Sequence, residues 1–328
     1  MEQYCIGIDL GGTNIKIAIF HSDYEKAGES RIPTEVHLGS DMVLARILDG
    51  IIDLIDREHI PKEYIGCIGI GVPGLLDMER GISRFSPNFP SWEDVPVIEH
   101  FQSRLRIPTY MDNDVRVNLY GEWRCGAAKG KQNVVLLTIG TGLGAGIVLD
   151  GHVLYGATGS AGEIGHMNMY RTGRPCRCQS SGCLGRYVSA LGLVRTLKEK
   201  LQAGETSIVA RWVDHDLDQI TAEMISSAYD AGDAAAIDTM HETGEILGYG
   251  LVNIINLYNP EIIVIGGGMS AAGERLLAAA RAIVDTHALQ ISRNACSIVT
   301  AALGDSAGML GAAIYANETM NTSERTHL

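Results

Sequence analysis

A strand, a glycine-rich turn and a second strand occur in that order twice in this chain, and the repeat constrains the fold more than any other feature. The first copy is CIGIDLGGTNIKIAIF at residues 5–20, where β-branched residues flank the glycines. The second copy is NVVLLTIGTGLGAGIVLDGHVL at residues 133–154. The repeat predicts two related α/β lobes that face each other across a cleft.

The segments between and after the two hairpins follow an α/β order. Apolar residues at helical spacing and short buried-strand runs predict the intervening elements. These are a helix at 41–58, a strand at 64–72, a helix at 97–105, a strand at 107–114, a helix at 234–256, a strand at 261–269 and a C-terminal helix. We expect a small lobe over residues 1–118, completed by the C-terminal helix of about 305–328, and a large lobe over residues 119–304.

Composition narrows the class of partner. With 328 residues and 46% hydrophobic content, the chain can bury a substantial core. Its net charge of −13 disfavours broad binding to nucleic acid or to an anionic membrane, and favours a small-molecule partner. The start of the chain lacks the features of a secretory signal, and no apolar run is long enough to span a bilayer. We therefore expect a cytoplasmic protein.

The first glycine turn follows an aspartate at the end of a strand, in IDLGGTNIK. Glycines let backbone amides approach phosphate oxygens, while the carboxylate can lie near a hydrated magnesium ion. The pattern is not a Walker loop, since the chain has no GxxxxGK(S/T) motif. An ordinary hairpin turn would look similar, so this motif alone leaves both interpretations open. The candidate nucleotide-site residues here are Asp9, Gly11, Gly12, Thr13 and Lys16.

Two further glycine motifs support a nucleotide site. LTIGTGLGAGI resembles a dinucleotide fingerprint, but a strand follows it where that fingerprint needs a helix. IVIGGGM runs from a buried strand into a turn that a base or ribose can approach closely, although a tight turn without ligand is the alternative. The candidate residues are Thr138, Gly140, Thr141, Gly142, Gly266, Gly267 and Gly268.

The ordered set of DLGGT, TIGTG and IGGG motifs resembles the ROK family of bacterial sugar kinases, from Gly7 to Ala313. The resemblance implies a two-lobed, actin-like ATPase fold in which the first two motifs bind the phosphates of ATP and the third borders its adenosine. It also implies a homodimer, and often a structural zinc ion.

The resemblance extends to the sugar site and the catalytic base. A kinase of this type needs a carboxylate within reach of the attacking hydroxyl, with Mg²⁺ offsetting phosphate charge. In MDND, Asn113 and Asp114 match the family's sugar-binding amide and catalytic base, whereas Asp112 lies outside that pair. Asp112 would share a face with Asp114 if the strand were extended, which makes it a weaker candidate. Asn88 resembles another sugar contact, with a turn-stabilising role as the alternative.

The GEIGHM segment supplies Glu163 and His166, which resemble the family's sugar-binding acid and a histidine with two tasks. His166, Cys176, Cys178 and Cys183 form an HX9CXCX4C pattern, enough for a closed tetrahedral zinc site. Because no position is left for an activated water, we expect a structural Zn²⁺ that holds the loop presenting Glu163. Reduced thiols without metal are the alternative.

Four positions depart from the family pattern. Val115 and Arg116 replace an alanine and a second asparagine after the catalytic pair, and Gln179 replaces a glycine in the cysteine loop. Gly185 stands where a sugar-contacting glutamate is usual. Since a lost hydrogen bond costs about 1 kcal/mol, we expect a weaker preference for plain glucose, or tolerance of a substituted hexose.

These features predict an ATP-dependent kinase that phosphorylates a hexose at its 6-hydroxyl, with glucose as the best single guess and Asp114 as the base. N-acetylmannosamine, allose, mannose, fructose or an amino sugar is the alternative acceptor, and polyphosphate an alternative donor. A sugar-responsive ROK regulator fits less well, since the kinase fold begins by Cys5 and the charge is acidic. A catalytically impaired relative, suggested by Arg116 and Gly185, is the third alternative.

Overall fold

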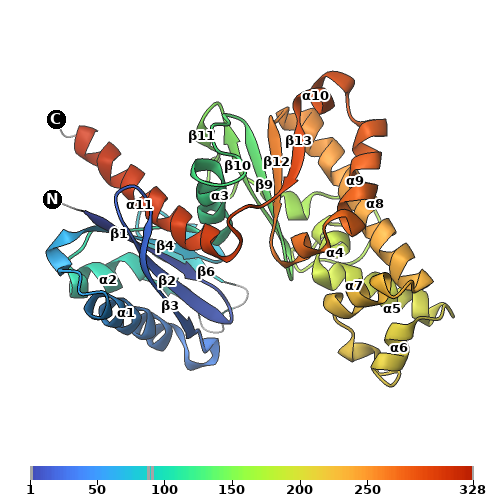
Figure 1. Ribbon diagram of the computed structural model, residues 1–328, viewed down its shortest axis with the longest axis horizontal. Coiled ribbons are helices and arrows are strands. Elements are labelled where there is room, and N and C mark those ends of the chain that lie inside the picture. Colours follow the sequence, from blue (N-terminus) through green and yellow to red (C-terminus); the bar gives the residue numbers. More distant parts are fainter. Residues whose placement is uncertain (1–2, 87–88, 90–91, 327–328) are drawn as a thin grey trace. The chain divides into compact units, whose positions relative to one another are not determined.

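The computed structural model describes residues 3–86, 89 and 92–326, which fold into two compact units (Figure 1). Unit 1 is made from the chain up to Gly130, from Tyr155–Ala161 and from the chain after residue 301. Unit 2 is made from Lys131–Leu154 and Gly162–Ala301. A seven-residue excursion of the chain, 155–161, therefore belongs to unit 1 although unit 2 precedes and follows it.

The main sheet of unit 1 has the strand order β3-β2-β1-β4-β8. Strand β1 pairs antiparallel with β2 and parallel with β4, as the first glycine hairpin and the following strand predict. Three short strands form a second sheet in the order β5-β6-β7. The elements are β1 (Tyr4–Leu10), β2 (Asn14–Phe20), β3 (Lys26–Pro33), α1 (Ser40–Arg57), β4 (Ile65–Val72), β5 (Leu75–Asp77), β6 (Ile82–Phe85), β7 (Glu93–Val95), α2 (Val97–Leu105), β8 (Thr109–Asn113), α3 (Asp114–Arg124) and α11 (Ala307–Thr326).

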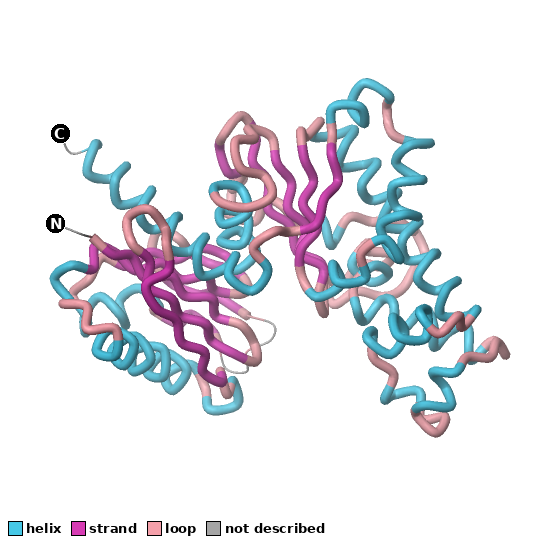
Figure 2. Tube along the Cα trace, viewed as in Figure 1, coloured by secondary structure: helices cyan, strands magenta, loops and turns pink. Residues whose placement is uncertain are grey.

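The sequence Ile-Gly-Ile occurs at residues 6–8 of β1 and at residues 68–70 of β4, so isoleucine and glycine lie on opposite faces of the sheet there. Ile8 and Ile70 are fully buried in a core shared with α1 and α2. Gly7 and Gly69 pair across the strands, and a Cβ on either would lie 1.8 Å from a backbone oxygen of α11. The backbone of α11 therefore rests directly on the glycine face, opposite α1 and α2 (Figure 2). The predicted C-terminal helix is confirmed.

Unit 2 repeats this topology. Its sheet has the order β11-β10-β9-β12-β13, with β9 antiparallel to β10 and parallel to β12. The predicted repeat is confirmed, because hairpin and parallel neighbours occupy matching places in both sheets. The elements are β9 (Val134–Ile139), β10 (Leu143–Leu149), β11 (His152–Val153), α4 (Gly185–Val188), α5 (Ala190–Gln202), α6 (Ile208–Trp212), α7 (Ala222–Asp230), α8 (Ala234–Tyr258), β12 (Ile262–Gly266), α9 (Glu274–His287), α10 (Gln290–Ala295) and β13 (Ser297–Thr300).

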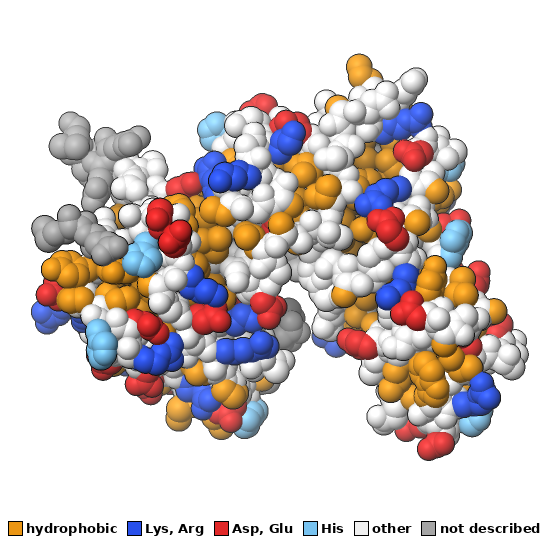
Figure 3. Space-filling view, in the orientation of Figure 1, with side chains coloured by type: hydrophobic (Ala, Val, Ile, Leu, Met, Phe, Trp, Pro, Cys, Tyr) orange, Lys and Arg blue, Asp and Glu red, His pale blue; other side chains and the backbone are white. Residues whose placement is uncertain are grey.

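The surface carries charges of both signs. On the face drawn in Figure 3, lysine and arginine side chains lie among aspartates and glutamates rather than gathered in one basic area. Among the helices of the described residues, none is long and apolar enough to cross a bilayer.

Candidate active site

The turn between β1 and β2 leaves open space at Gly12, the second of its two glycines. The Gly11 amide donates to the Asn14 carbonyl (3.1 Å), and the buried Thr34 hydroxyl donates to the Gly11 carbonyl (2.6 Å). A Cβ on Gly12 would meet no atom within 4 Å, and its φ does not demand glycine. The fold itself therefore does not explain this glycine, whereas the close approach of a phosphate to the backbone does.

Asp9 lies beside this turn, in a row across the sheet that contains Lys16 on β2 and Gly71 on β4. A Cβ on Gly308, in the first turn of α11, would lie 2.7 Å from Asp9 Cγ, so the carboxylate packs against the start of that helix. Burial raises the pKa of Asp9, while Lys16 opposes the rise. Lys16 Nζ also lies 3.0 Å from Asp305 Oδ1. Sequence reasoning missed Asp305, whose signal is an acid just before the small-residue C-terminal helix.

The predicted sugar-binding asparagine, Asn113, and the predicted catalytic base, Asp114, lie where β8 ends and α3 begins. Asn113 is the N-cap of α3: its Oδ1 accepts from the Val115 amide (3.0 Å), and its Nδ2 donates to the Gly74 carbonyl (3.3 Å). These two contacts use half of the four hydrogen bonds that an asparagine amide can make. The other half can serve a ligand.

Asp114 is the first residue of α3, and its surroundings make it a stronger base than an ordinary aspartate. Its side chain keeps part of its surface exposed, but protein surrounds it closely enough for desolvation to dominate. Desolvation and the charge of Asp9 raise the pKa of Asp114 to about 6, against the opposing effect of backbone amides at the helix start. Such a carboxylate is ionised at neutral pH and can accept a hydroxyl proton.

Asp112 does not share the face of Asp114, as an extended strand would require. The strand ends at Asn113, so the helical turn directs Asp114 elsewhere. Asp112 has no exposed surface and accepts from Arg116 Nε (2.6 Å) and from the Tyr155 hydroxyl (2.8 Å). Burial raises the pKa of Asp112, and both partners oppose that rise. The expectation of a shared face was wrong, and Asp112 is an anchor within unit 1.

In unit 2, the turn between β9 and β10 has the same open character as the first turn. The Gly140 amide donates to the Gly142 carbonyl (2.9 Å), and a Cβ on either glycine would meet no atom within 4 Å. Thr141 lies between them. At the end of β9, the hydroxyl oxygen of Thr138 is buried and has no hydrogen-bond partner among the described residues. An orphaned buried hydroxyl beside an open glycine turn fits a polar ligand such as phosphate.

The three glycines at the end of β12 and in the turn after it differ in how much room they leave. Gly267 has a φ of 80°, and a Cβ there would lie 2.4 Å from the Ile139 carbonyl oxygen, so the fold requires this glycine. Gly266 has ordinary room for a side chain, whereas a Cβ on Gly268 would meet no atom within 4 Å. Gly268 starts a short 3₁₀ helix and is the position best suited to a close approach by a ligand.

The four predicted zinc ligands come together in unit 2. One ligand atom from each of His166, Cys176, Cys178 and Cys183 lies within 4.8 Å of all the others. Cys176 Sγ is 3.6 Å from His166 Nδ1, and the Cys178 and Cys183 sulfurs are 3.6 Å apart. Zinc bonds of about 2.3 Å to sulfur and about 2.0 Å to nitrogen place tetrahedral ligands about 3.5–3.8 Å apart, so the set fits the ion.

His166 also faces the predicted sugar-binding acid. Its Nδ1 lies toward Cys176, while its Nε2 is 3.9 Å from Glu163 Oε2. Both side chains keep about half or more of their surface exposed, at 47% for His166 and 63% for Glu163. One imidazole can therefore bind a metal through Nδ1 and orient a carboxylate through Nε2.

The structure describes the local surroundings of two residues that depart from the family pattern, Gln179 and Gly185. Gln179 has a φ of 71°, the left-handed region that favours glycine, which accounts for the glycine usual at this position. Gly185 begins α4, and a Cβ there would lie 3.2 Å from the Gly165 carbonyl oxygen and 3.4 Å from Leu143 Cβ. A side chain at this position would need only a small local adjustment. Asn88, the remaining predicted sugar contact, lies outside the described residues.

Comparison with known proteins gives a consistent result over almost the whole chain. The family model described as the ROK family matches residues 5–319. The glucokinase of Halalkalibacterium halodurans is 34% identical over 326 residues, which cover 99% of this chain and 98% of that protein. A ROK family glucokinase from Streptomyces griseus, solved in complex with glucose and AMPPNP, superposes with a TM-score of 0.81 and is 30% identical, covering 96% of this chain and 99% of that one.

A regulator is also similar to the chain. The xylose repressor of Caldicellulosiruptor bescii is 31% identical over 311 residues, which cover 93% of this chain but 76% of that protein. Both enzymes and a regulator are thus similar to this chain over most of its length. With the family model matched from residue 5 to residue 319, the chain belongs to the ROK family.

Proposed function

We propose that this protein is a sugar kinase that transfers the γ-phosphoryl group of ATP to the 6-hydroxyl of a hexose, with glucose as the acceptor. The observation that carries the proposal is Asp114, a carboxylate with a pKa raised to about 6 at the junction of β8 and α3. A regulator that only binds sugar has no need of such a base. The glucokinases of H. halodurans and S. griseus, which match nearly end to end, support the same reading.

In the proposed reaction, the ionised Asp114 accepts the proton of the 6-hydroxyl as that oxygen bonds to the γ-phosphorus. The bond from the γ-phosphorus to the bridging oxygen breaks, and ADP leaves with the electron pair. The proton stays on Asp114 and then passes to solvent. Mg²⁺, when bound, offsets charge on the phosphates. Most of the rate gain comes from holding the reactants in line, so the positioning residues matter as much as the base.

The nucleotide contacts in the proposal follow the open glycine turns. In unit 1, we assign them to Asp9, Lys16 and the Gly11–Thr13 turn, with the Asp9 carboxylate available to hydrated Mg²⁺. In unit 2, we assign phosphate contacts to Thr138 and the Gly140–Gly142 turn. The Gly266–Gly268 turn borders the adenosine.

The sugar contacts in the proposal are Asn88, Asn113, Asp114, Glu163 and His166. Zn²⁺ bound by His166, Cys176, Cys178 and Cys183 would be structural, since all four tetrahedral positions come from protein. Such an ion would fix the loop that carries Glu163. We further propose that units 1 and 2 correspond to the small and large lobes, and that the protein is a cytoplasmic homodimer without nucleic-acid or membrane partners.

The test of this function is ADP release by the purified, zinc-supplied protein with MgATP and a panel of hexoses and amino sugars. Strong turnover of glucose supports the proposal. Selective turnover of another hexose would support the kinase activity but would show that glucose is not the acceptor. The similarity to the xylose repressor makes a sugar-responsive regulator the second candidate. Glucose binding without turnover of any hexose would favour that regulator.

The pH profile is expected to report the titration of Asp114. Because a general base must be deprotonated, kcat/KM for glucose should fall as the pH drops through about 6, with a limiting slope of about one. The measurement is kcat/KM between pH 5 and pH 8 at saturating MgATP. A profile that is flat down to pH 5 would show that the enzyme–MgATP complex does not depend on this carboxyl.

Restoring the usual acid at position 185 is expected to strengthen glucose binding. A Gly185→Glu variant regains a hydrogen-bond acceptor near the start of α4, so KM for glucose should fall by about fivefold, in line with one hydrogen bond of about 1 kcal/mol. Discrimination against hexoses substituted on that edge should rise. Gly185→Gln, with the same size but no charge, is the matched control. Equal KM values in wild type and both variants would show that position 185 does not face the sugar.

A further inference from the structure

Arg116 has a buried environment that the proposed reaction does not explain. It lies in the first turn of α3, two residues after Asp114, and only 6% of it is exposed. Its Nε donates to Asp112 Oδ1 at 2.6 Å, and its Nη1 donates to the Gly159 carbonyl at 2.8 Å. A planar guanidinium is pre-organised to make both bonds from one position, whereas an ammonium on a flexible stem is not.

On one side, this arrangement holds the residue that we assign to the sugar. Asp112 Oδ1 accepts both from Arg116 Nε and from the backbone amide of Asn113, each at 2.6 Å. The Asn113 side chain is then held by the Val115 amide at the start of α3. The position of the sugar-binding amide therefore depends on a carboxylate that is itself fixed by Arg116.

On the other side, the arrangement holds the excursion 155–161, which belongs to unit 1 and is followed by Glu163 in the chain. The Tyr155 hydroxyl donates to Asp112 Oδ2 (2.8 Å), and the Arg116 guanidinium lies 4.9 Å from the centre of the Tyr155 ring. With the bond from Arg116 to Gly159, the excursion is fixed at both its beginning and its middle.

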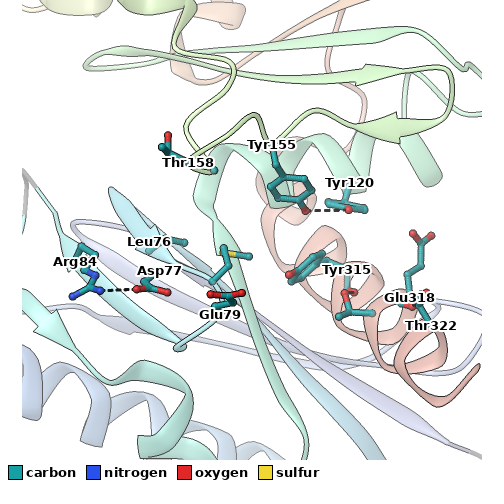
Figure 4. Close-up of a pocket in the computed structure, with 13 residues that line it drawn as sticks. Leu76, Asp77, Glu79, Arg84, Tyr120, Tyr155, Thr158, Tyr315, Glu318 and Thr322 are labelled. Carbon is teal, nitrogen blue, oxygen red and sulfur yellow. Dashed lines mark hydrogen bonds and ion pairs between the residues drawn. The ribbon is translucent and has the colours of Figure 1, made fainter. Parts of the chain in front are cut away.

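Besides these polar contacts, Tyr155 borders an open space. A cavity of about 740 Å³ opens beside its ring, lined also by Tyr120, Tyr315 and residues of β5 and α11 (Figure 4). The Tyr120 and Tyr155 hydroxyls are 3.3 Å apart, and the Tyr120 and Tyr315 ring centres are 5.3 Å apart. Since the cavity leaves room beside the ring, loss of the hydroxyl would free Tyr155 to move.

We propose that Arg116 and Tyr155 are positioning residues for the sugar acceptor, acting through Asp112. They hold Asn113 and the excursion 155–161 in one arrangement, so the affinity for sugar depends on them. The proposal rests on the proposed function. The nucleotide turn at Gly11–Thr13 is held separately by Thr34, so the affinity for ATP does not depend on this network.

The test compares Tyr155→Phe, Arg116→Met and Arg116→Lys with Tyr315→Phe, the matched control. Tyr315→Phe removes a hydroxyl from the same aromatic group, but Tyr315 is not one of the hydrogen-bond partners of Asp112. Steady-state kinetics give KM for glucose, KM for ATP and kcat. Calorimetry of glucose binding without nucleotide gives a readout that does not need turnover.

Tyr155→Phe and Arg116→Met are expected to raise KM and Kd for glucose by about tenfold or more, with KM for ATP changed by less than about twofold. Arg116→Lys should keep part of the glucose affinity that Arg116→Met loses. In an additional variant, Arg116→Ala, millimolar guanidinium should restore part of the lost affinity. Tyr315→Phe should match wild type.

Glucose and ATP constants in Tyr155→Phe that stay within twofold of wild type would overturn the inference, and so would equal losses of affinity for both substrates. Tyr155→Phe is the deciding variant if Arg116→Met does not fold. A wild-type protein that phosphorylates no hexose would overturn the proposed function itself. Normal wild-type turnover with unaffected variants would overturn the positioning role alone.

Discussion

Replacing Asp114 by asparagine is expected to lower kcat for glucose phosphorylation by about 10²–10⁴-fold, the range typical of the loss of a general base. The amide cannot accept the hydroxyl proton, although it has nearly the same shape. Nucleotide binding should change little, because the glycine turns and Lys16 remain. The measurements are kcat with MgATP and glucose, and Kd for ATP by calorimetry.

The same variant carries its own control for folding. The raised pKa means that the folded protein binds the Asp114 proton more tightly than the unfolded chain, so the ionised form at pH 7.5 lowers stability. Removing that charge should raise Tm or leave it unchanged, and the gain should shrink as the pH falls below about 6. If the Asp114→Asn variant is inactive but has a normal or higher Tm, its low kcat results from the missing base and not from unfolding. Turnover near the wild-type rate would remove Asp114 from the mechanism.

Removal of the proposed zinc site is expected to have the second large effect. A Cys178→Ser variant should lose bound zinc, melt at a lower temperature and show a fall of about tenfold or more in kcat/KM for glucose, since the ion would hold the loop presenting Glu163. Cys178 is exposed, so serine leaves no buried cavity there. Zinc content by atomic spectroscopy, Tm and glucose kinetics are the measurements.

Cys296→Ser is the matched control, because Cys296 belongs to unit 2 but lies outside the ligand cluster. It should keep the zinc and the kinetics of wild type. Treatment of the wild-type protein with a chelator should reproduce the Cys178→Ser result, and added Zn²⁺ should reverse it. Full glucose turnover by a protein shown to contain no zinc would rule out the structural role.

The parts of the fold that the sequence could predict are those with short-range patterns. Hairpins flanked by β-branched residues, helices with regular apolar spacing and a clustered set of cysteines can each be recognised within one stretch of chain. The end of β8 was harder, since MDND continues as α3 and only the Asn113 cap marks the change. That one-residue difference decides that Asp112 and Asp114 have different tasks.

Features that depend on distant contacts could not be predicted in this way. Nothing in residues 155–161 indicates that Tyr155 reaches Asp112, 43 positions earlier, or that Gly159 receives a bond from Arg116. The sequence suggested that Arg116 would disturb a sugar site, whereas its bonds to Asp112 and Gly159 fit the positioning role that we propose for it. The Ile-Gly-Ile sequences of β1 and β4 do carry such information, since a glycine within a strand can mark a place where another backbone approaches closely.

The glycine face of unit 1 also orders events during synthesis. The helix that covers Gly7 and Gly69, α11, is synthesised after every residue of unit 2. Domains generally fold as units while the chain emerges. Unit 2 therefore has all its parts before unit 1 does, and strands β1 and β4 must wait, with one side uncovered, until α11 has been synthesised.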